Sequence, residues 1–164
     1  MSKQSFLNEF YPIPAHKATD TWIKAIDHSL LKWSGLLPEN LDNHRCVYDG
    51  CGVIYDGRGF CRNHVLSFDN KACALCAKAE IEAELVDEFD ELDECLMCPL
   101  EQLSGLACHD DGSAYAVGMS GDPKAMLELL YRAKKFVMIN DIVASDRPVS
   151  TLSSPIMEFS DYLN

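Results

Sequence analysis

The chain has 164 residues, 48% of them hydrophobic and 24% charged, a balance that is typical of a soluble globular protein and predicts one domain over residues 1–164. The first 14 residues carry no apolar run flanked by positive charge, and no segment approaches the length of a membrane span. We therefore expect a cytoplasmic protein without an export signal or a membrane partner. The net charge of −12, from 26 acidic and 14 basic residues, should repel a phosphate backbone and disfavours direct nucleic-acid binding.

Residues 1–18 are predicted to form an extended arm, because Pro12 and Pro14 interrupt any regular element. Disordered segments are usually poor in aromatic residues, so this arm should lie against the body of the protein. Its apolar side chains are Phe6, Leu7, Phe10, Tyr11 and Ile13.

Residues 20–34 predict the first clear helix, with Gly35 at its end and Pro38 at the start of a second, shorter helix. One apolar stripe runs along the first helix at helical spacing and should pack into the core, although two tryptophans also suit a partner surface. His28 lies on the opposite side and is expected in solvent. The stripe consists of Trp22, Ile26, Leu30 and Trp33.

All eight cysteines lie between Cys46 and Cys108, at spacings that are typical of metal ligands. The first module covers residues 44–66. Three glycines and Asp56 stand between its second and third cysteines and predict a tight turn between two short strands. The predicted ligands are Cys46, Cys51, Cys61 and His64.

The second module, residues 71–110, offers five cysteines for four ligand places. Two Cys-x2-Cys turns make the most economical site, and the main alternative is that Cys108 replaces Cys95. His109 stands beside Cys108, but adjacent residues rarely both point at one ion. The predicted ligands are Cys73, Cys76, Cys95 and Cys98, which leave Cys108 as a buried thiol.

We interpret both modules as structural zinc sites, with two zinc ions per chain. Disulfides would suit a short exported chain, whereas thiols in the cytoplasm stay reduced unless they bind metal or do redox work. An iron–sulfur cluster on the five cysteines of the second module is the remaining alternative. Four protein ligands leave no open position for water, so neither zinc is expected to catalyse a reaction.

Nine acidic residues and no basic residue lie between Glu80 and Glu94, where we expect an amphipathic helix. Its apolar face should pack onto the body through Ile81, Leu85, Phe89, Leu92 and Leu96. Its acidic face is either simply solvated or a docking surface for a basic or nucleic-acid-binding protein. The candidate partner-binding residues are Glu84, Asp87, Glu88 and Glu91.

Further along, Pro99 should start a short helix that ends at Gly105, and Asp111-Gly112 predicts a hairpin within residues 106–120. Asp122 and Pro123 then begin a helix over residues 122–140. The tail, residues 145–164, is rich in Ser and Pro and suits a docked terminal turn or a short linear motif. The apolar stripe of the helix is Met126, Leu130, Ala133 and Val137.

The motifs of several enzyme classes are missing from the sequence. No histidine has Glu two residues later, as zinc deaminases need, and there is no His-Glu-x2-His, Gly-x4-Gly-Lys or Gly-x-Ser-x-Gly. A thioredoxin-like role for the pair Cys73 and Cys76 would need a βαβ context, whereas an acidic helix follows. We therefore do not expect an enzyme.

Several motifs spread over residues 20–140 resemble small cysteine-rich zinc proteins of bacteriophages and prophages. They are Trp33-Ser-Gly-Leu, Cys73-Ala-Leu-Cys76, Cys95-x2-Cys98-Pro-Leu, Cys108 and Asp122-Pro-x-x-Met126. This resemblance implies a phage source and an intracellular location in the host cell, but no activity. In the first module, Gly57-Arg-Gly-Phe-Cys61-Arg-Asn-His64 is similar to the zinc knuckles of phage HNH-type and endonuclease VII-like nucleases. That likeness implies a shared zinc scaffold only, because the chain lacks the Asp-His catalytic pair of those enzymes.

Taken together, the sequence predicts a small α+β domain, mostly helical, with two structural zinc modules and short hairpins. The functional hypothesis is a non-enzymatic phage accessory protein that binds a host or phage protein, one such role being inhibition of a host defence or transcription component. The acidic helix and the helix over residues 20–34 are the candidate surfaces. The alternative is a zinc-dependent nucleic-acid-binding or nuclease-related protein, with Arg58, Arg62 and Lys71 contacting phosphate.

Overall fold

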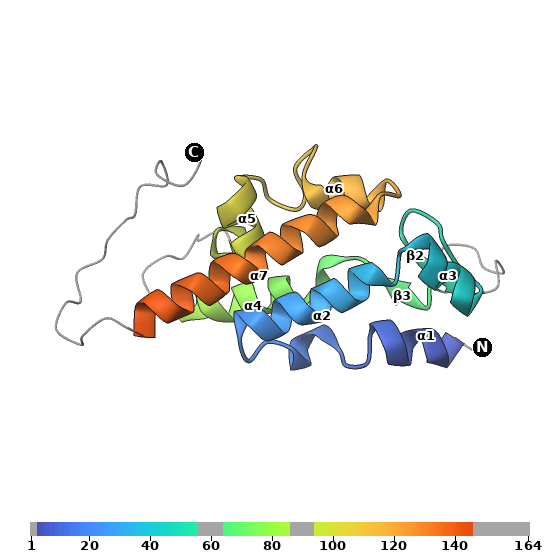
Figure 1. The fold of residues 1–164 in the computed structure, drawn as a ribbon, viewed down its shortest axis with the longest axis horizontal. Helices are drawn as coiled ribbons and strands as arrows, with labels where there is room; N and C mark the ends of the chain where they lie inside the picture. The colour runs from blue at the N-terminus through green and yellow to red at the C-terminus, as the bar shows by residue number, and fades with distance from the viewer. Residues whose placement is uncertain (1–2, 56–63, 86–93, 146–164) are drawn as a thin grey trace.

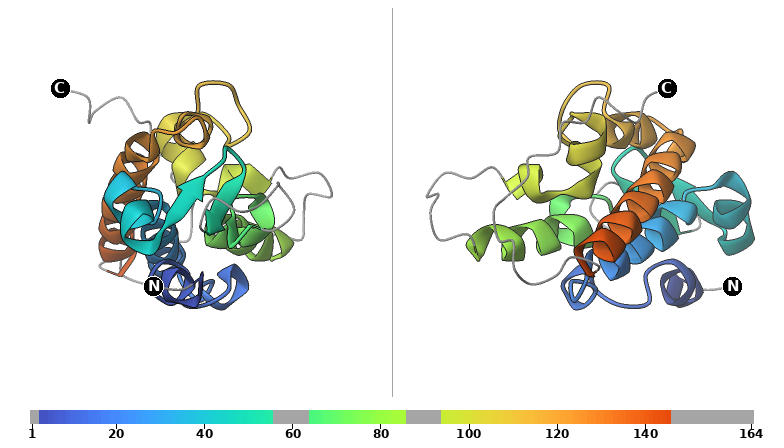
Figure 2. Two further views of the ribbon diagram at one scale, coloured as in Figure 1. Left: turned by 90° about the vertical axis from the view of Figure 1, so that its right-hand side faces the viewer. Right: turned by 60° about the vertical axis from the view of Figure 1, so that its left-hand side comes forward.

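Two helices, α2 (Trp22–Ser34) and α7 (Pro123–Ser145), pack side by side along the middle of the molecule (Figure 1). The computed structural model describes residues 3–55, 64–85 and 94–145. A third helix, α4 (Ala74–Glu84), packs against α2, and Figure 2 shows it on the side of the molecule opposite α7. The other elements are α1 (Lys3–Phe10), η1 (Ala15–Lys17), α3 (Pro38–His44), β1 (Cys46–Tyr48), β2 (Gly52–Tyr55), β3 (Leu66–Ser67), η2 (Asn70–Ala72), η3 (Glu94–Met97), α5 (Pro99–Ser104) and α6 (Ala114–Met119). The chain is thus a small, mostly helical α+β domain, which confirms the predicted fold class.

The small sheet is antiparallel, with strand order β1-β2-β3. β1 pairs with β2 so that Cys46 lies opposite Tyr55, and β2 pairs with β3 so that Val53 lies opposite Leu66. The predicted turn between two short strands falls on residues 56–63, which lie outside the described residues. The strands on either side of that turn, β2 and β3, pair as such a turn requires.

Helix α2 presents the predicted apolar stripe to the core. Thr21 caps its start, since the Thr21 Oγ1 accepts a hydrogen bond from the Lys24 amide at 3.2 Å. Ile26 is fully buried and Trp33 is 4% exposed, while the other two residues of the stripe are partly buried against the same core. A Cβ at Gly118 would lie 2.6 Å from Trp33 Cζ3, so α6 reaches the indole only because that position is a glycine.

The N-terminal residues fold into helix α1 rather than the expected extended arm. Pro12 and Pro14 follow this helix and therefore do not interrupt it. Phe6 and Phe10, four residues apart, share the buried face of α1 and are 0% and 4% exposed. The arm thus lies against the body, as its aromatic content predicted.

His28 is buried, and the prediction of a solvated histidine is wrong. Its Nε2–H donates to the Ile13 carbonyl at 2.9 Å, and its ring lies edge-on to Tyr11 at a centroid distance of 4.9 Å. Burial lowers the pKa of His28. The N-terminal arm covers this side of α2, a contact that the periodicity of the helix cannot reveal.

The predicted hairpin within residues 106–120 is also wrong, because a turn and helix α6 occupy this segment. Ser113 caps α6, since its Oγ accepts a hydrogen bond from the Ala116 amide at 3.1 Å. The next helix, α7, begins at Pro123 as predicted and extends to Ser145, beyond the expected end at residue 140. Its predicted stripe is buried and consists of Met126, Leu130, Ala133 and Val137.

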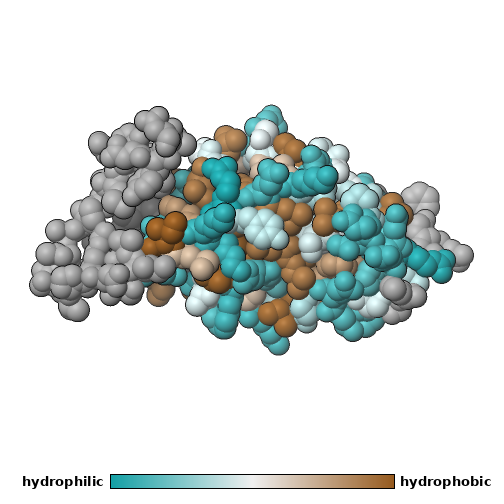
Figure 3. Space-filling view, viewed as in Figure 1, coloured by the Kyte–Doolittle hydropathy of each residue, from teal (hydrophilic) through white to brown (hydrophobic). Residues whose placement is uncertain are grey.

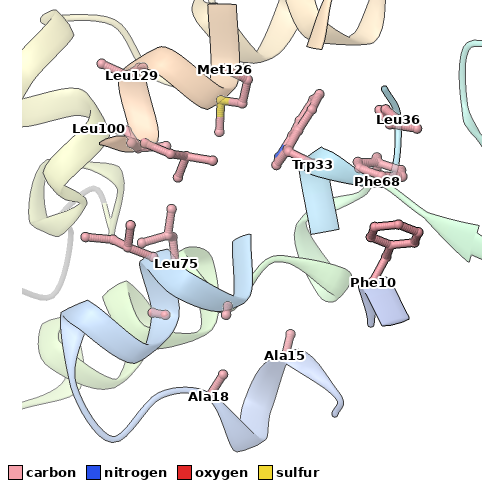
Figure 4. Close-up of a cluster of buried hydrophobic side chains, with 14 of the residues drawn as sticks. Phe10, Ala15, Ala18, Trp33, Leu36, Phe68, Leu75, Leu100, Met126 and Leu129 are labelled. Carbon is pink, nitrogen blue, oxygen red and sulfur yellow. The ribbon is translucent and has the colours of Figure 1, made fainter. Parts of the chain in front are cut away.

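The core joins these helices to the sheet end of the molecule (Figure 4). Met126, Leu100 and Leu75 meet on one side of the core, and each is at most 3% exposed. Trp33 and Phe68 lie on the other side with their ring centroids 5.1 Å apart. This continuous core fixes the starts of α4 and α5 relative to α2.

The acidic segment is helical only in its first part within the described residues. Helix α4 ends at Glu84, and residues 86–93, which include Asp87, Glu88 and Glu91, lie outside them. The expected packing of Ile81 and Leu85 onto the body is wrong, because they are 40% and 74% exposed. The buried residues of α4 lie closer to its start and are Ala74, Leu75, Lys78 and Ala79.

Within residues 3–55, 64–85 and 94–145, no helix combines the length and the apolar composition that crossing a membrane would take. Figure 3 shows hydrophobic and hydrophilic residues intermingled on the face formed by α2 and α7. Tyr131 and Ile139 of α7 are among the exposed apolar side chains, at 59% and 60%. Single exposed apolar residues of this kind are ordinary on a protein surface.

Candidate metal centre

Five cysteines from three segments of the chain line one cavity of about 350 Å³. Cys73 and Cys76 belong to the start of α4, Cys95 lies in η3, Cys98 precedes α5, and Cys108 lies in the loop before α6. The structure therefore brings every predicted ligand of the second module to one place and adds Cys108 to them. All cysteines in the described part of the chain are free thiols.

The pair in α4 is held by the start of the helix, where Cys73 is the N-cap residue. The Cys73 Sγ accepts hydrogen bonds from the Cys76 thiol and from the amides of Cys76 and Leu75, and these lower the pKa of Cys73. Donation to Cys73, together with burial, raises the pKa of Cys76. Because the first turn of a helix has amides without intrahelical acceptors, this position favours a thiolate.

A similar arrangement recurs at α5, where Cys98 is the N-cap residue. Burial raises the pKa of Cys98 to about 12, and hydrogen bonds from the amides of Leu100 and Glu101 oppose that rise. Two helices thus start at the same cavity, each with a cysteine whose sulfur accepts amide hydrogen bonds. Zinc binds cysteine as thiolate, and such donors stabilise the thiolate form.

The loop that carries Cys108 is fixed by its own hydrogen bonds. The Ser113 hydroxyl donates to the Cys108 carbonyl at 2.9 Å, and the Ala107 amide donates to Asp110 Oδ2 at 2.8 Å. Burial raises the pKa of Cys108 to about 12, with further contributions from the charges of neighbouring thiols. Cys108 is therefore placed at the cavity by a defined loop.

Electrostatic interactions show which thiols lie near one another. The pKa of Cys76 is raised first by its hydrogen bond to Cys73, and among its further causes the charge of Cys108 acts more strongly than that of Cys98. The charge of Cys95 acts instead on Cys98 and Cys108. Three thiols are common to both possible ligand sets, and Cys108 and Cys95 compete for the fourth place.

As the side chains stand, no group of three or more His, Cys, Asp or Glu residues in the described ranges is arranged to hold a metal ion. The five thiols share a cavity without forming a finished coordination sphere. Ligands of structural zinc sites usually converge only when the ion binds, since binding and folding are coupled. The donor set, five soft sulfur ligands, suits zinc.

The predicted ligands of the first module lie less close together than those of the second. Cys46 opens β1 and is 4% exposed, with its thiol 3.6 Å from the His44 carbonyl oxygen that accepts its hydrogen bond. Cys51 lies in the turn after β1, beyond roughly 7 Å of strand, and is exposed. Cys61 lies outside the described residues, so its contribution stays a prediction.

His64 lies beside the turn that holds Cys51. Its Nε2 is 2.9 Å from Asp49 Oδ2, and the other carboxylate oxygen, Oδ1, accepts hydrogen bonds from the amides of Cys51 and Gly52 at 3.0 Å each. A Cβ at Gly52 would lie 2.7 Å from His64 Cγ, so the glycine makes room for the ring. In the neutral imidazole Nε2 donates to the carboxylate, which leaves the Nδ1 lone pair to bind a metal or a proton.

Two residues of these sites were not found from the sequence, Asp49 and Lys32. Asp49 stands two residues before Cys51, the usual place of an Asx turn, and this signal could have shown it. Lys32 follows Ala25 and Ser29 at spacings of seven and three on α2, so it shares a face with two small residues. All three are buried, and small residues at this spacing leave room for the longer side chain.

The two predicted partner surfaces are the acidic segment, residues 80–94, and helix α2. Glu84, the one proposed partner-binding residue within the described ranges, is exposed at the end of α4. Trp33 and Ile26 are buried and Trp22 and Leu30 are partly buried, so the stripe of α2 packs into the core, and a partner surface on this helix stays a prediction.

Comparisons with protein-family models, with curated proteins and with solved structures gave no match to this chain.

Proposed function

We propose that this chain is a structural zinc protein that acts without catalysis, by binding another protein. The observation that carries the proposal is the cavity in which cysteines from three segments meet, two of them as N-caps of helices that start there. Zinc bound at this cavity would tie α4, α5 and the loop before α6 to one another. Four thiolate ligands leave no open position, so the ion would serve the fold rather than a reaction.

For the second module the ligands would be Cys73, Cys76 and Cys98 with either Cys95 or Cys108. The charge of Cys108 acts on Cys76, whereas that of Cys95 acts on Cys98 and Cys108, and this, together with the fixed loop of Cys108, favours Cys108 over the Cys95 expected from spacing. The other zinc would use the predicted first-module ligands, which are Cys46, Cys51, Cys61 and His64.

The partner would be a host or phage protein with a basic or nucleic-acid-binding surface, in the cytoplasm of a phage-infected cell. This part of the proposal rests on the acidity of residues 80–94, on the exposed Glu84 and on the resemblance of the motifs to phage proteins. Inhibition of a defence or transcription component is one role that such a protein could have.

Elemental analysis of protein purified without added metal tests the zinc proposal. We expect close to two zinc ions per chain in the wild type and one in each of the variants Cys76→Ser and Cys51→Ser. Iron with visible absorbance would replace zinc by an iron–sulfur cluster. Metal-free protein that folds and melts normally would contradict the proposal.

A second candidate is a nuclease-related protein, and the pair of His64 with Asp49 favours it. Asp49 and His64 are not adjacent in the sequence, but the fold brings these two residues together across 15 positions. A histidine oriented by a carboxylate can accept a proton at Nδ1, as a general base must. Nicking of a supercoiled plasmid with Mg²⁺, abolished by His64→Ala, would support this function, and an intact plasmid would exclude it.

A further inference from the structure

Lys32 is a buried lysine that pairs with no carboxylate among the residues that the structure describes. Lys32 is 3% exposed, and its Nζ donates a hydrogen bond to the Ala72 carbonyl at 2.7 Å. Nζ also lies 4.5 Å from the centre of the Phe68 ring and 5.7 Å from that of Tyr11. No carboxylate of the described residues is within ion-pair distance of it. Burying a charge is costly unless an opposite charge compensates it, and the aromatic faces do so only in part.

The place of Lys32 shows where the compensating charge would be. Lys32 lines the same cavity as the five cysteines, and the carbonyl that it binds belongs to the peptide bond leading into Cys73. Burial lowers the pKa of Lys32 to about 8, and negative charge on Cys73, Asp69 and Cys76 acts in the opposite direction. The ammonium therefore lies beside the pair of thiols at the start of α4.

Apart from Lys32, the charged side chains around the cavity are mostly acidic and disfavour additional negative charge there. Asp69, Glu94 and Glu101 line it along with His109, and Lys32 is the lysine or arginine that faces them among the described residues. Zinc with four thiolates has a net charge of −2, so it would add to the acidic side of this balance. A nearby cation lowers the electrostatic cost of forming the four thiolates.

We propose that Lys32 is the counter-charge of the thiolate metal centre, and this rests on the zinc-binding function proposed above. Lys32 is a positioning residue: it binds the backbone that carries Cys73 and raises the affinity of the centre for the metal through its charge. Residues around a metal site that do not themselves bind the ion typically change its affinity by about tenfold to a hundredfold. The simpler role, in which Lys32 only fills space and holds the Ala72 carbonyl, predicts no effect of its charge.

Two variants separate the charge from the packing. Lys32→Met keeps the length of the side chain and removes the ammonium, while Lys32→Arg keeps a positive charge. Lys24→Met is the matched control, because Lys24 lies on the same helix but pairs at the surface with Asp20. Competition with a chromophoric zinc chelator then measures the affinity of the second-module site in each protein, with the first module removed by Cys51→Ser throughout.

We expect Lys32→Met to weaken zinc binding about tenfold to a hundredfold at unchanged stoichiometry, and Lys32→Arg and Lys24→Met to stay within about threefold of the parent. Iron placed in the same site gives a readout that packing alone would not move. Loss of a positive charge disfavours the reduced, more negative centre, so Lys32→Met should lower its reduction potential. Equal affinity and equal potential for the parent and Lys32→Met would overturn the proposal.

A measurement on the unmodified side chain covers the case in which Lys32→Met does not fold. In the zinc-loaded parent protein, the Lys32 ¹⁵Nζ resonance should be that of an ammonium at pH 8, and a neutral amine there would contradict the counter-charge. If the parent protein itself binds no metal in the second module, the zinc proposal fails. If the parent binds zinc but shows a neutral amine, only the counter-charge fails.

Discussion

The two cysteine modules differ in how the fold holds their candidate ligands. In the second, five thiols from three segments face one cavity, and helices packed in the core form its walls. In the first, Cys46 opens β1 and Cys51 lies in the turn after it, and His64 is held beside Cys51 by Asp49. Cysteines at close spacing are thus brought together in one module and only partly in the other.

The difference follows from the elements that carry the cysteines. The start of a helix offers free amide donors and places residues such as Cys73 and Cys76 on one turn, so both thiols face the same way. A strand alternates its side chains between two faces, and its hairpin gathers ligands only where the turn folds back. Cys46, which is buried in the core, and Cys51, which is exposed, show this contrast.

The largest effect is therefore expected from the second module. Cys76→Ser should remove one zinc ion and lower the melting temperature sharply, because the energy of binding structural zinc is also folding energy. Cys51→Ser should remove the other zinc ion but lower the melting temperature less, because the core around α2 and α7 does not include that turn. Elemental analysis and thermal unfolding followed by circular dichroism measure both.

Two results would break this contrast. If Cys51→Ser lowers the melting temperature as much as Cys76→Ser does, the first module supports the core just as strongly. If the wild type holds only one zinc ion and Cys51→Ser keeps it, the first module is no metal site.

The second-largest effect is expected from the fourth ligand of the second module. Cys108→Ser should lower the zinc affinity and melting temperature nearly as much as Cys76→Ser does, because the charge of Cys108 acts on Cys76 and hydrogen bonds fix its loop at the cavity. Cys95→Ser should lower the zinc affinity and the melting temperature less, and the second module should still bind one zinc ion. The reverse order would show that two Cys-x2-Cys turns form the site, as the spacing alone predicts.

Much of the fold could be predicted from local sequence, and the rest of it depends on contacts between distant segments. The helix starts at Pro38, Pro99 and Pro123 follow from proline at the first turn, and the stripe of α7 follows from its period. Burial of His28 depends instead on Ile13 in the arm, 15 residues away, which no local pattern contains.

The same limit applies to the site. The cysteines could be named from their spacing, but Lys32 acquires its role only when α4 brings the Ala72 carbonyl to it across 40 residues. The pairing of Asp49 with His64 likewise needs β2 and β3 to bring the two segments together. Exposure of Leu85 could not be predicted from an amphipathic period, because α4 packs through its first part, which includes Leu75 and Ala79, and not through its end.

Thiol reactivity should distinguish the two modules at a smaller scale. Hydrogen bonds from Cys76 and the helix amides lower the pKa of Cys73, whereas burial raises that of Cys46. In metal-free protein at pH 7, Cys73 should therefore be mostly thiolate and react with iodoacetamide at least about tenfold faster than Cys46, which should react only at higher pH. Peptide mass spectrometry of timed samples gives both rates, and zinc should protect Cys73. Equal rates at pH 7 would contradict the proposed thiolate at the start of α4.

The smallest effect on the fold is expected from the acidic segment, which separates a solvated face from a docking surface. Replacing Glu84, Asp87, Glu88 and Glu91 by Gln should leave zinc content and melting temperature close to those of the wild type, since relief of like-charge repulsion is worth only a few tenths of a kcal/mol per pair. If the segment docks a basic partner, the variant should associate more slowly with the protein captured from infected cells, and salt should affect its rate less, because exposed charges act mainly by steering.

The control replaces four exposed acids elsewhere, Glu39, Asp42, Asp111 and Glu128, and changes the net charge by the same amount. Equal slowing in both variants would assign the effect to net charge, and unchanged rates at low and high salt would leave residues 80–94 as a solvated face.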